Sequence, residues 1–142
     1  MTTTIGASDL RIDLDVIHLA EHARVHSVGC RTGRPHSTKV CFAGAGSTVH
    51  VLAHRRADGQ PADWYRNVVG GGATFLEVGD IVLPVSVVVP ADRVAAHRLV
   101  VGLFAEKYGE ATVSGWHSAP SALPLRLDVD VVAGFPMRVS QP

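Results

Sequence analysis

Short β-rich runs separated by glycine-containing turns constrain the fold of this chain more than any other feature. Thr48–Ala53 (TVHVLA) is one such run, and Phe75–Val78 and Ile81–Val89 flank the dipeptide Gly79-Asp80. Two β-rich runs around a turn dipeptide are typical of a β-hairpin. Residues 31–35, Arg-Thr-Gly-Arg-Pro, place glycine and proline between two further runs and predict another hairpin turn. The chain is therefore expected to consist mainly of short antiparallel strands.

Further strands and turns complete this pattern. Apolar and charged residues alternate over Leu10–Val16, and this period of two predicts a half-buried strand. Pro84 favours an edge strand or a bulge, because proline cannot donate a ladder hydrogen bond. We also expect a short helical turn over Ile17–Ala23, a strand ending at Gly29, a turn at Ala43–Gly46, and a last strand around Leu125–Val132.

Helices are expected at two places. Between Asp92 and Tyr108, apolar residues recur at spacings of three and four, and Gly109 follows as a helix terminator. A shorter helix is expected after Pro61, ended by the three glycines at 70–72. Antiparallel strands around one long and one short helix predict a barrel-like domain of the mostly β or α+β class, spanning residues 1–142 as one unit.

Size and composition limit the classes of function. The chain has 142 residues, and its 13 Lys and Arg balance its 13 Asp and Glu, so no general positive field favours nucleic acid. Two cysteines are too few for a disulfide framework, and the N-terminus lacks the pattern of a signal peptide. The most apolar run is far shorter than the roughly 20 residues that span a bilayer. We therefore expect a soluble, cytoplasmic domain without a membrane span.

The string His18-Leu-Ala-Glu21-His22 matches the H-x-x-E-H pattern of inverted zinc metalloproteases. In such enzymes both histidines lie on one side of a long helix, and a distant carboxylate supplies a third ligand. Here the expected helix is about two turns at most. Eight histidines in a chain of this length also make the spacing easy to reach by chance. We therefore interpret these as surface histidines and expect no metal site.

Basic residues gather in the first turn and in the loop after the 48–53 run. They are Arg31, Arg34, His36 and Lys39 in and after the turn, and Arg55 and Arg56 in the loop. If turn and loop are neighbours, these side chains and the turn backbone can bind phosphate or carboxylate. The alternative is a set of solvated loop charges.

Aromatic residues and cysteines offer fewer signals. Trp64 and Tyr65 are compatible with core packing. Tyr108 and Trp116 are candidates for lining a pocket, where a phenol can donate a proton and an indole can stack on a flat ring, with core packing as the alternative. The two cysteines, at positions 30 and 41, lack the spacing of a redox or metal motif and are expected to be inert.

Two segments resemble the deazaflavin-dependent nitroreductase family. Residues 29–36 (GCRTGRPH) are similar to its G-R-x-T/S-G-x-P-R turn, and residues 49–67 are similar to its strand, S-K-G-G loop and W-Y-x-N-L element, with the same loop length before Trp64 and Tyr65. The later order of hairpin, long helix ending in Tyr108 and terminal strand after Pro124 also agrees. The resemblance covers Gly29 to about Val131.

The resemblance implies a split β-barrel of the FMN-binding-like kind and hydride transfer from reduced coenzyme F420 to an activated alkene or nitro compound. It implies tail-binding residues in turn and loop, with His36 standing where the family has a second turn arginine and Cys30 where it has the first. The implied cofactor-binding set is Arg31, Thr32, Arg34, His36, Lys39, Arg55, Arg56 and Trp64. Tyr108 and His54 are the candidate proton donors.

Other interpretations stay open. The family's further tyrosines after Tyr108 are absent, with Ala111 and Ser114 closest in position, which favours a cofactor-free member. Such a member would be a small-molecule binding protein or a non-redox enzyme such as an isomerase or cyclase. FMN in the same groove is a third interpretation, and a homodimer is compatible with each of the three.

Overall fold

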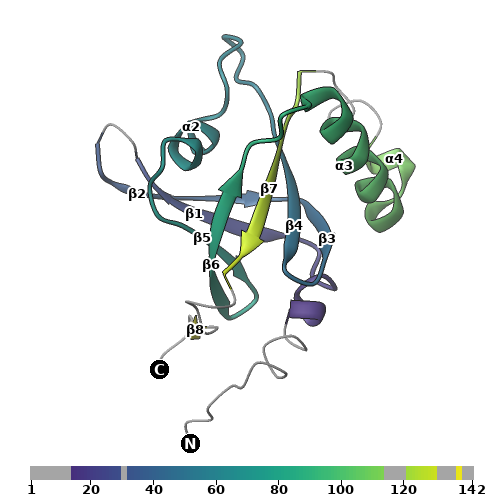
Figure 1. Cartoon of the computed structure of the whole chain (residues 1–142), viewed down its shortest axis with the longest axis horizontal. Coiled ribbons are helices and arrows are strands. Elements are labelled where there is room, and N and C mark those ends of the chain that lie inside the picture. Colours follow the sequence, from purple (N-terminus) through teal and green to yellow (C-terminus); the bar gives the residue numbers. More distant parts are fainter. Residues whose placement is uncertain (1–13, 30–31, 114–120, 131–136, 139–142) are drawn as a thin grey trace, which may run out of the picture.

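The computed structural model describes residues 14–29, 32–113, 121–130 and 137–138 (Figure 1). Its strands are β1 (Ala23–Val28), β2 (Pro35–Val40), β3 (Phe42–Ala45), β4 (Thr48–Ala53), β5 (Thr74–Val78), β6 (Ile81–Val88), β7 (Leu123–Val129) and β8 (Met137–Arg138). The named helices are α2 (Asp63–Val69), α3 (Arg93–Tyr108) and α4 (Glu110–Val113). All strand pairs are antiparallel, which confirms the expected mostly β fold.

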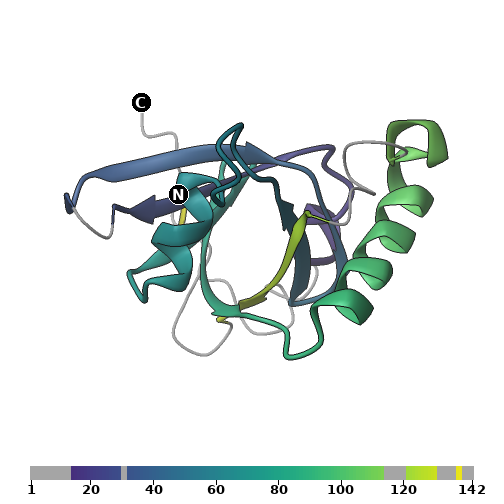
Figure 2. The ribbon, with the colours of Figure 1, turned by 90° about the horizontal axis from the view of Figure 1, so that it is seen from above.

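The sheet closes because one nearly continuous segment supplies both of its end strands. The strand order is β2-β1-β5-β6-β7-β4-β3, with β8 beside β6. Only Cys41 separates β2 from β3, so this segment pairs first with β1 and then with β4. Figure 2 shows the strands enclosing a common interior. A sheet that closes in this way leaves few exposed strand edges.

Alternate residues of the strands fill this interior. The largest fully buried side chains on the strands include Val25, Phe42, Val51, Leu76 and Leu125. Burial of each such side chain contributes roughly 1.5–3 kcal/mol of hydrophobic stabilisation. Helix α2 adds buried residues to the same cluster through Trp64 and Val68. Trp64 is thus part of the core, in agreement with the core-packing interpretation of the sequence.

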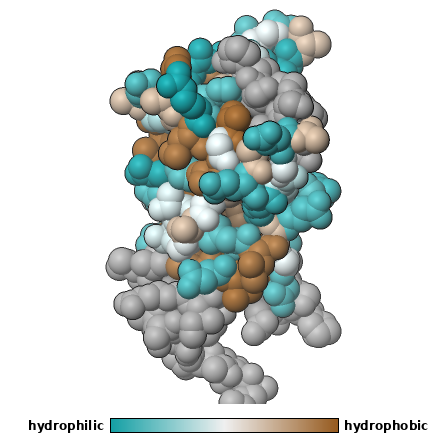
Figure 3. All heavy atoms as spheres, turned by 90° about the vertical axis from the view of Figure 1, so that its right-hand side faces the viewer, coloured by the Kyte–Doolittle hydropathy of each residue, from teal (hydrophilic) through white to brown (hydrophobic). Residues whose placement is uncertain are grey.

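Helix α3 packs against the outside of the barrel. Val100 and Phe104 form a second buried cluster with Ala43, Leu52 and Ala122. Other apolar residues of α3 reach the surface, since Val94 is 63% and Leu99 is 54% exposed. Figure 3 shows hydrophobic side chains on the face to which α3 and α4 belong. Only some of the apolar residues that predicted this helix are therefore buried in the core.

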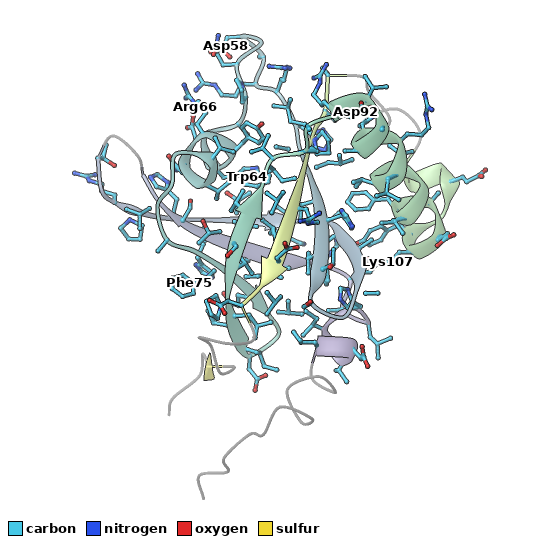
Figure 4. All side chains as sticks on the ribbon, viewed as in Figure 1. Asp58, Trp64, Arg66, Phe75, Asp92 and Lys107 are labelled. Carbon is cyan, nitrogen blue, oxygen red and sulfur yellow. The ribbon has the colours of Figure 1, made fainter. Side chains whose placement is uncertain are left out.

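The last turn of α3 satisfies backbone groups at the bend between β2 and β3. The Tyr108 hydroxyl accepts a hydrogen bond from the Phe42 N–H at 3.0 Å and donates to the Glu21 carbonyl oxygen at 2.6 Å. Lys107 Nζ donates to the Phe42 carbonyl oxygen at 2.8 Å and lies 3.6 Å from the centre of the Phe42 ring. Figure 4 shows Lys107 at this end of the helix. Buried backbone groups without such partners would cost stability.

Most sequence-based expectations for the middle of the chain are confirmed. The strand over Thr48–Ala53 has the expected bounds, and β5 and β6 form the hairpin around Gly79-Asp80, where Gly79 adopts a φ of 62°. Such a φ strongly favours glycine. Asp92 is the N-cap of α3, its side chain accepting a hydrogen bond from the N–H of Ala95.

The strand predicted over Leu10–Val16 is wrong where the structure describes it. Residues 14–17 are helical, and residues 10–13 lie outside the described part. Leu14 and Ile17 are each 3% exposed, whereas Val16 is 54% exposed. The two buried side chains are three positions apart, a helical spacing, and their burial in the core decides the local structure against the period of two.

Three further expectations are corrected. Ala43 to Ala45 belong to β3, and the turn is confined to residues 46–47, because β3 pairs with β4 up to Ala45 and Thr48. Pro84 lies in an interior strand rather than at an edge. It is tolerated there because it falls between the stretches of β6 that pair with β8 and with β7. The final predicted strand runs over Leu123–Val129 and is followed by β8.

No helix in the described part of the chain has both the length and the apolar character needed to cross a membrane.

Candidate ligand-binding site

A cavity of about 480 Å³ opens where β2, the end of β4 and α2 meet. Its lining residues are His22, Thr38, Lys39, Val40, Cys41, Leu52, His54, Arg55, Arg56, Ala62 and Trp64. Small-molecule sites commonly have volumes of about 300–1,000 Å³ and combine an apolar wall with a few polar groups. This cavity has both properties.

The loop that carries Arg55 and Arg56 is held by backbone hydrogen bonds. Arg55 pairs with Pro61 in an isolated β-bridge, and the Arg56 N–H donates to the Gln60 carbonyl oxygen at 2.7 Å. The Ala62 N–H donates to the His54 carbonyl oxygen at 3.1 Å. The loop is thus a narrow continuation of β4 that presents its two arginines in a defined position.

Arg56 is bound by carboxylates of the protein itself. Its guanidinium contacts Asp58 at 2.8 Å and Asp63 at 3.0 Å, and Arg66 contacts the same Asp63 oxygen at 2.7 Å. Hydrogen bonds from Arg66 and then Arg56 hold the pKa of Asp63 below its usual value. Figure 4 shows Asp58 and Arg66 in this region above Trp64. Because these carboxylates partly neutralise Arg56, it attracts an external anion less strongly than its position in the sequence suggested.

The charges of Lys39 and Arg55 are less neutralised by the protein's own carboxylates than the charge of Arg56 is. The Arg55 guanidinium donates to the Gly59 carbonyl oxygen at 3.2 Å. Among the described residues, neither Arg55 nor Lys39 forms an ion pair with a carboxylate. These two cations therefore dominate the attraction of the cavity for an anion.

The structure does not bring the first turn into this cavity. Thr32, Arg34 and His36 are exposed at the distal end of the β1–β2 hairpin and are absent from the lining. The Thr32 hydroxyl accepts a hydrogen bond from the Arg34 N–H at 3.3 Å, so it stabilises the turn itself. Arg31, like Cys30 and Trp116, lies outside the described residues. The assignment of Arg31, Thr32, Arg34 and His36 to cofactor binding stays a prediction.

The two predicted proton donors differ in position. His54 lies on the cavity wall. Tyr108 is not among the lining residues, and its hydroxyl is engaged with the backbone of Glu21 and Phe42. Burial raises the pKa of Tyr108 to about 12. This environment makes the Tyr108 hydroxyl a structural group at the bend, whereas His54 is one of the residues that line the cavity.

Among the cavity residues that were not predicted as site residues, His22 and Cys41 have titratable side chains. His22 stacks on Tyr108 with ring centres 6.3 Å apart and reaches the lining from the turn before β1. Its only sequence signal was the H-x-x-E-H string, which pointed to a different chemistry. Cys41 lies at the bend between β2 and β3, and burial raises the pKa of its thiol. A raised pKa keeps a thiol protonated and weakly nucleophilic at neutral pH.

The histidines of the H-x-x-E-H string have separate surroundings. The His18 ring bonds through Nε2 to the Gly46 carbonyl oxygen at 2.9 Å and lies 6.0 Å from the Phe42 ring, while His22 faces Tyr108. In the part of the chain that the structure describes, no three His, Cys, Asp or Glu residues form a group able to hold a metal ion.

Comparison with known proteins identifies the fold. No protein-family model matches the chain, and no curated protein sequence matches it. Among solved structures, it is similar to the heme storage protein HutZ from Vibrio cholerae, with a TM-score of 0.67 and 13% identity over 91% of this chain and 94% of that one. It is also similar to the F420-H2 dependent reductase FDR-A (TM-score 0.57, 17% identity, 78% and 94% covered). A FAD-binding protein from Mesorhizobium loti matches as well (TM-score 0.58, 13% identity, 84% and 88% covered).

These neighbours place the chain in the split-barrel, flavin-binding-like fold, as the resemblance implied. Their names refer to heme, F420-H2 and FAD, so the shared fold does not by itself identify a ligand. The ligand of this chain must therefore be inferred from its own side chains.

Proposed function

We propose that this protein is an oxidoreductase that holds coenzyme F420 in the cavity and reduces an electrophilic small molecule. One observation carries the proposal: the cavity combines an apolar wall containing Trp64 with the cations Lys39 and Arg55 and the imidazoles of His22 and His54. An apolar wall suits a flat ring system, and the cations suit an anionic tail.

The residues present fit such a cofactor. Val40, Leu52, Ala62 and Trp64 would enclose its ring, and Lys39 and Arg55 would bind its anionic part, with Arg56 contributing less because of its own carboxylate partners. When bound in reduced form, the deazaflavin supplies a hydride. The imidazolium of His54 would donate the proton that completes reduction of the substrate. Tyr108, which is not among the lining residues, stays the other proton donor proposed from the sequence.

Titration of purified protein with F420 and, separately, with FMN tests this proposal. Removal of the Arg55 guanidinium should weaken F420 binding about ten- to hundred-fold, the equivalent of roughly 1.5–3 kcal/mol for hydrogen bonds to a charged group. Arg56→Ala should have a smaller effect. Arg31→Ala should match Arg55→Ala if the turn also contributes, and Arg93→Ala on α3 is the control. Preferential binding of FMN would replace F420 in the proposal.

A cofactor-free binding protein or non-redox enzyme is the second candidate. Two observations favour it. Asp58 and Asp63 form ion pairs with Arg56, and Thr32, Arg34 and His36 of the first turn are not among the lining residues of the cavity. Wild-type protein that binds neither cofactor would support this candidate and contradict the first.

A further inference from the structure

A second groove adjoins the cavity on the side of β1 and β5. It has a volume of about 290 Å³ and is lined by His22, Ala23, Arg24, Lys39, Glu77 and Gly79. His22 and Lys39 line both hollows, so the groove continues the cavity across a shared edge. Arg24 and His22 precede the segment that resembles the nitroreductase family, and the only motif that contains either residue is the H-x-x-E-H string ending at His22.

The strand register sets the charges of this groove. Arg24 on β1 lies directly opposite Lys39 on β2, and opposite Glu77 on β5 at its other side. Like charges in directly opposed positions of a sheet are destabilising. Arg24 and Lys39 nevertheless occupy such positions. In the part of the chain that the structure describes, no carboxylate forms an ion pair with either of them.

Glu77 does not neutralise both cations. Its carboxylate oxygen Oε1 lies 2.6 Å from the Nε2 atom of His26, which is two residues from Arg24 along β1. With that oxygen engaged by the imidazole, one carboxylate faces two permanent cations and His22. The groove thus has an excess of positive charge where it joins the cavity.

We propose that this groove binds the anionic extension of the molecule whose flat part occupies the cavity. The inference rests on the proposed function, and it assigns the tail to Arg24 and Lys39 instead of to the first turn. The occupant is a phosphate or carboxylate group attached to the ring system by a flexible linker. Arg24 offers a planar set of donors suited to either oxyanion, and Lys39 adds a point charge at the junction.

The register also explains why the first turn is a poorer site for this tail. Arg24 and Lys39 lie near the end of the hairpin at which Ala23 pairs with Val40, next to the cavity. The turn follows the pair Val28 and Pro35 at the opposite end. A tail leaving the cavity therefore meets Arg24 before it can reach the turn.

Binding of matched ligands with and without a tail tests the proposal. FMN is compared with riboflavin, and F420 with the deazaflavin riboside that lacks phosphate and glutamate. Ligand fluorescence is measured for wild type, Arg24→Ala, Arg34→Ala, Glu77→Gln and the control Arg93→Ala, at two salt concentrations, and circular dichroism checks that each variant is folded.

We expect Arg24→Ala to weaken binding of a tailed ligand about tenfold, with little change for its tail-free partner, since only the former loses a charge-assisted hydrogen bond. Glu77→Gln should strengthen binding of the tailed ligand, because a competing negative charge is removed, and a merely structural role would not produce this gain. An effect on FMN as well as F420 indicates a phosphate site, and an effect on F420 alone indicates a carboxylate site.

Equal binding of tailed and tail-free ligands, or a loss with Arg34→Ala instead of Arg24→Ala, overturns the groove assignment while leaving the proposed function intact. If no ligand of either pair binds to wild type, both the proposed function and the groove assignment fail.

Discussion

Replacement of Tyr108 by phenylalanine should destabilise the barrel through loss of a single oxygen atom. The hydroxyl has one proton, and its shortest contact, 2.6 Å to the Glu21 carbonyl oxygen, identifies the acceptor. Its lone pairs accept the Phe42 N–H at 3.0 Å. The aromatic ring keeps its edge contact with Phe104, whose centre is 5.6 Å away. The change therefore isolates the two hydrogen bonds from the packing of the ring.

The expected cost differs between the two partners. Glu21 is exposed, so its carbonyl can bond to water after the change and the loss is about 0.5 kcal/mol. Phe42 is fully buried, and its N–H is left without an acceptor, at a cost of about 1–3 kcal/mol. The free energy of unfolding should fall by about 2 kcal/mol in total, which corresponds to a decrease in Tm of about 6 °C for a domain of this size.

Urea unfolding followed by tryptophan fluorescence measures this change. The matched control is Tyr65→Phe, because the Tyr65 side chain is also half-buried but its hydroxyl makes no hydrogen bond to a described residue. The control should change stability by less than about 0.5 kcal/mol. A Tyr108→Phe protein as stable as wild type, or a control that loses as much, would refute the assignment of the hydroxyl to the Phe42 backbone.

Three further predictions concern stability. The pKa of Tyr108 rises from 10.0 to about 12 on folding, so unfolding releases a proton at pH values between these two. The contribution of Tyr108 to the free energy of unfolding should therefore be fully present below pH 10 and fall as the pH rises further. Urea titrations at several pH values should show this fall, and it should be less steep in Tyr108→Phe. Asp92→Ala removes the cap of α3 and should cost about 1 kcal/mol in thermal unfolding, while Asp92→Asn should keep most of it. Gly44→Ala places a Cβ in steric conflict with the Thr48 carbonyl oxygen and should cost about 3 kcal/mol or prevent folding. Gly102→Ala on α3 meets nothing within 4 Å and should stabilise by up to about 1 kcal/mol. Equal melting temperatures for the two variants would contradict the close approach of β3 and β4.

The candidate site was only partly predictable from the sequence. The loop after β4 was predicted as part of the site from its two basic residues after a clear strand and from the family resemblance of residues 49–67, and both are local features of the sequence. The neutralisation of Arg56 depends on Asp58 and Asp63, which the compact loop and the start of α2 bring to the same guanidinium. Charge clustering in a sequence does not report such pairing.

His22 shows a different limit. The sequence does not show which way a histidine side chain points. The H-x-x-E-H spacing suggested a metal site, whereas His22 stacks on Tyr108, 86 positions later, and lines the cavity. The cross-strand pair of Arg24 and Lys39 likewise cannot be predicted without the strand register. A shift of one residue in the pairing would place the two side chains on opposite faces of the sheet.

The sequence by itself determined the elements whose signals are local: the strand at Thr48–Ala53, the Gly79-Asp80 hairpin and the helix that begins after Asp92. Turn residues, caps and apolar periodicity act within a few positions, so they can be read without a fold. Only the tertiary structure decided that residues 14–17 are helical, that Pro84 lies inside the sheet, and that Cys41 marks the bend at which one segment closes the barrel. These outcomes depend on contacts between residues far apart in the chain, and burial in the shared core outweighs the weaker local preferences.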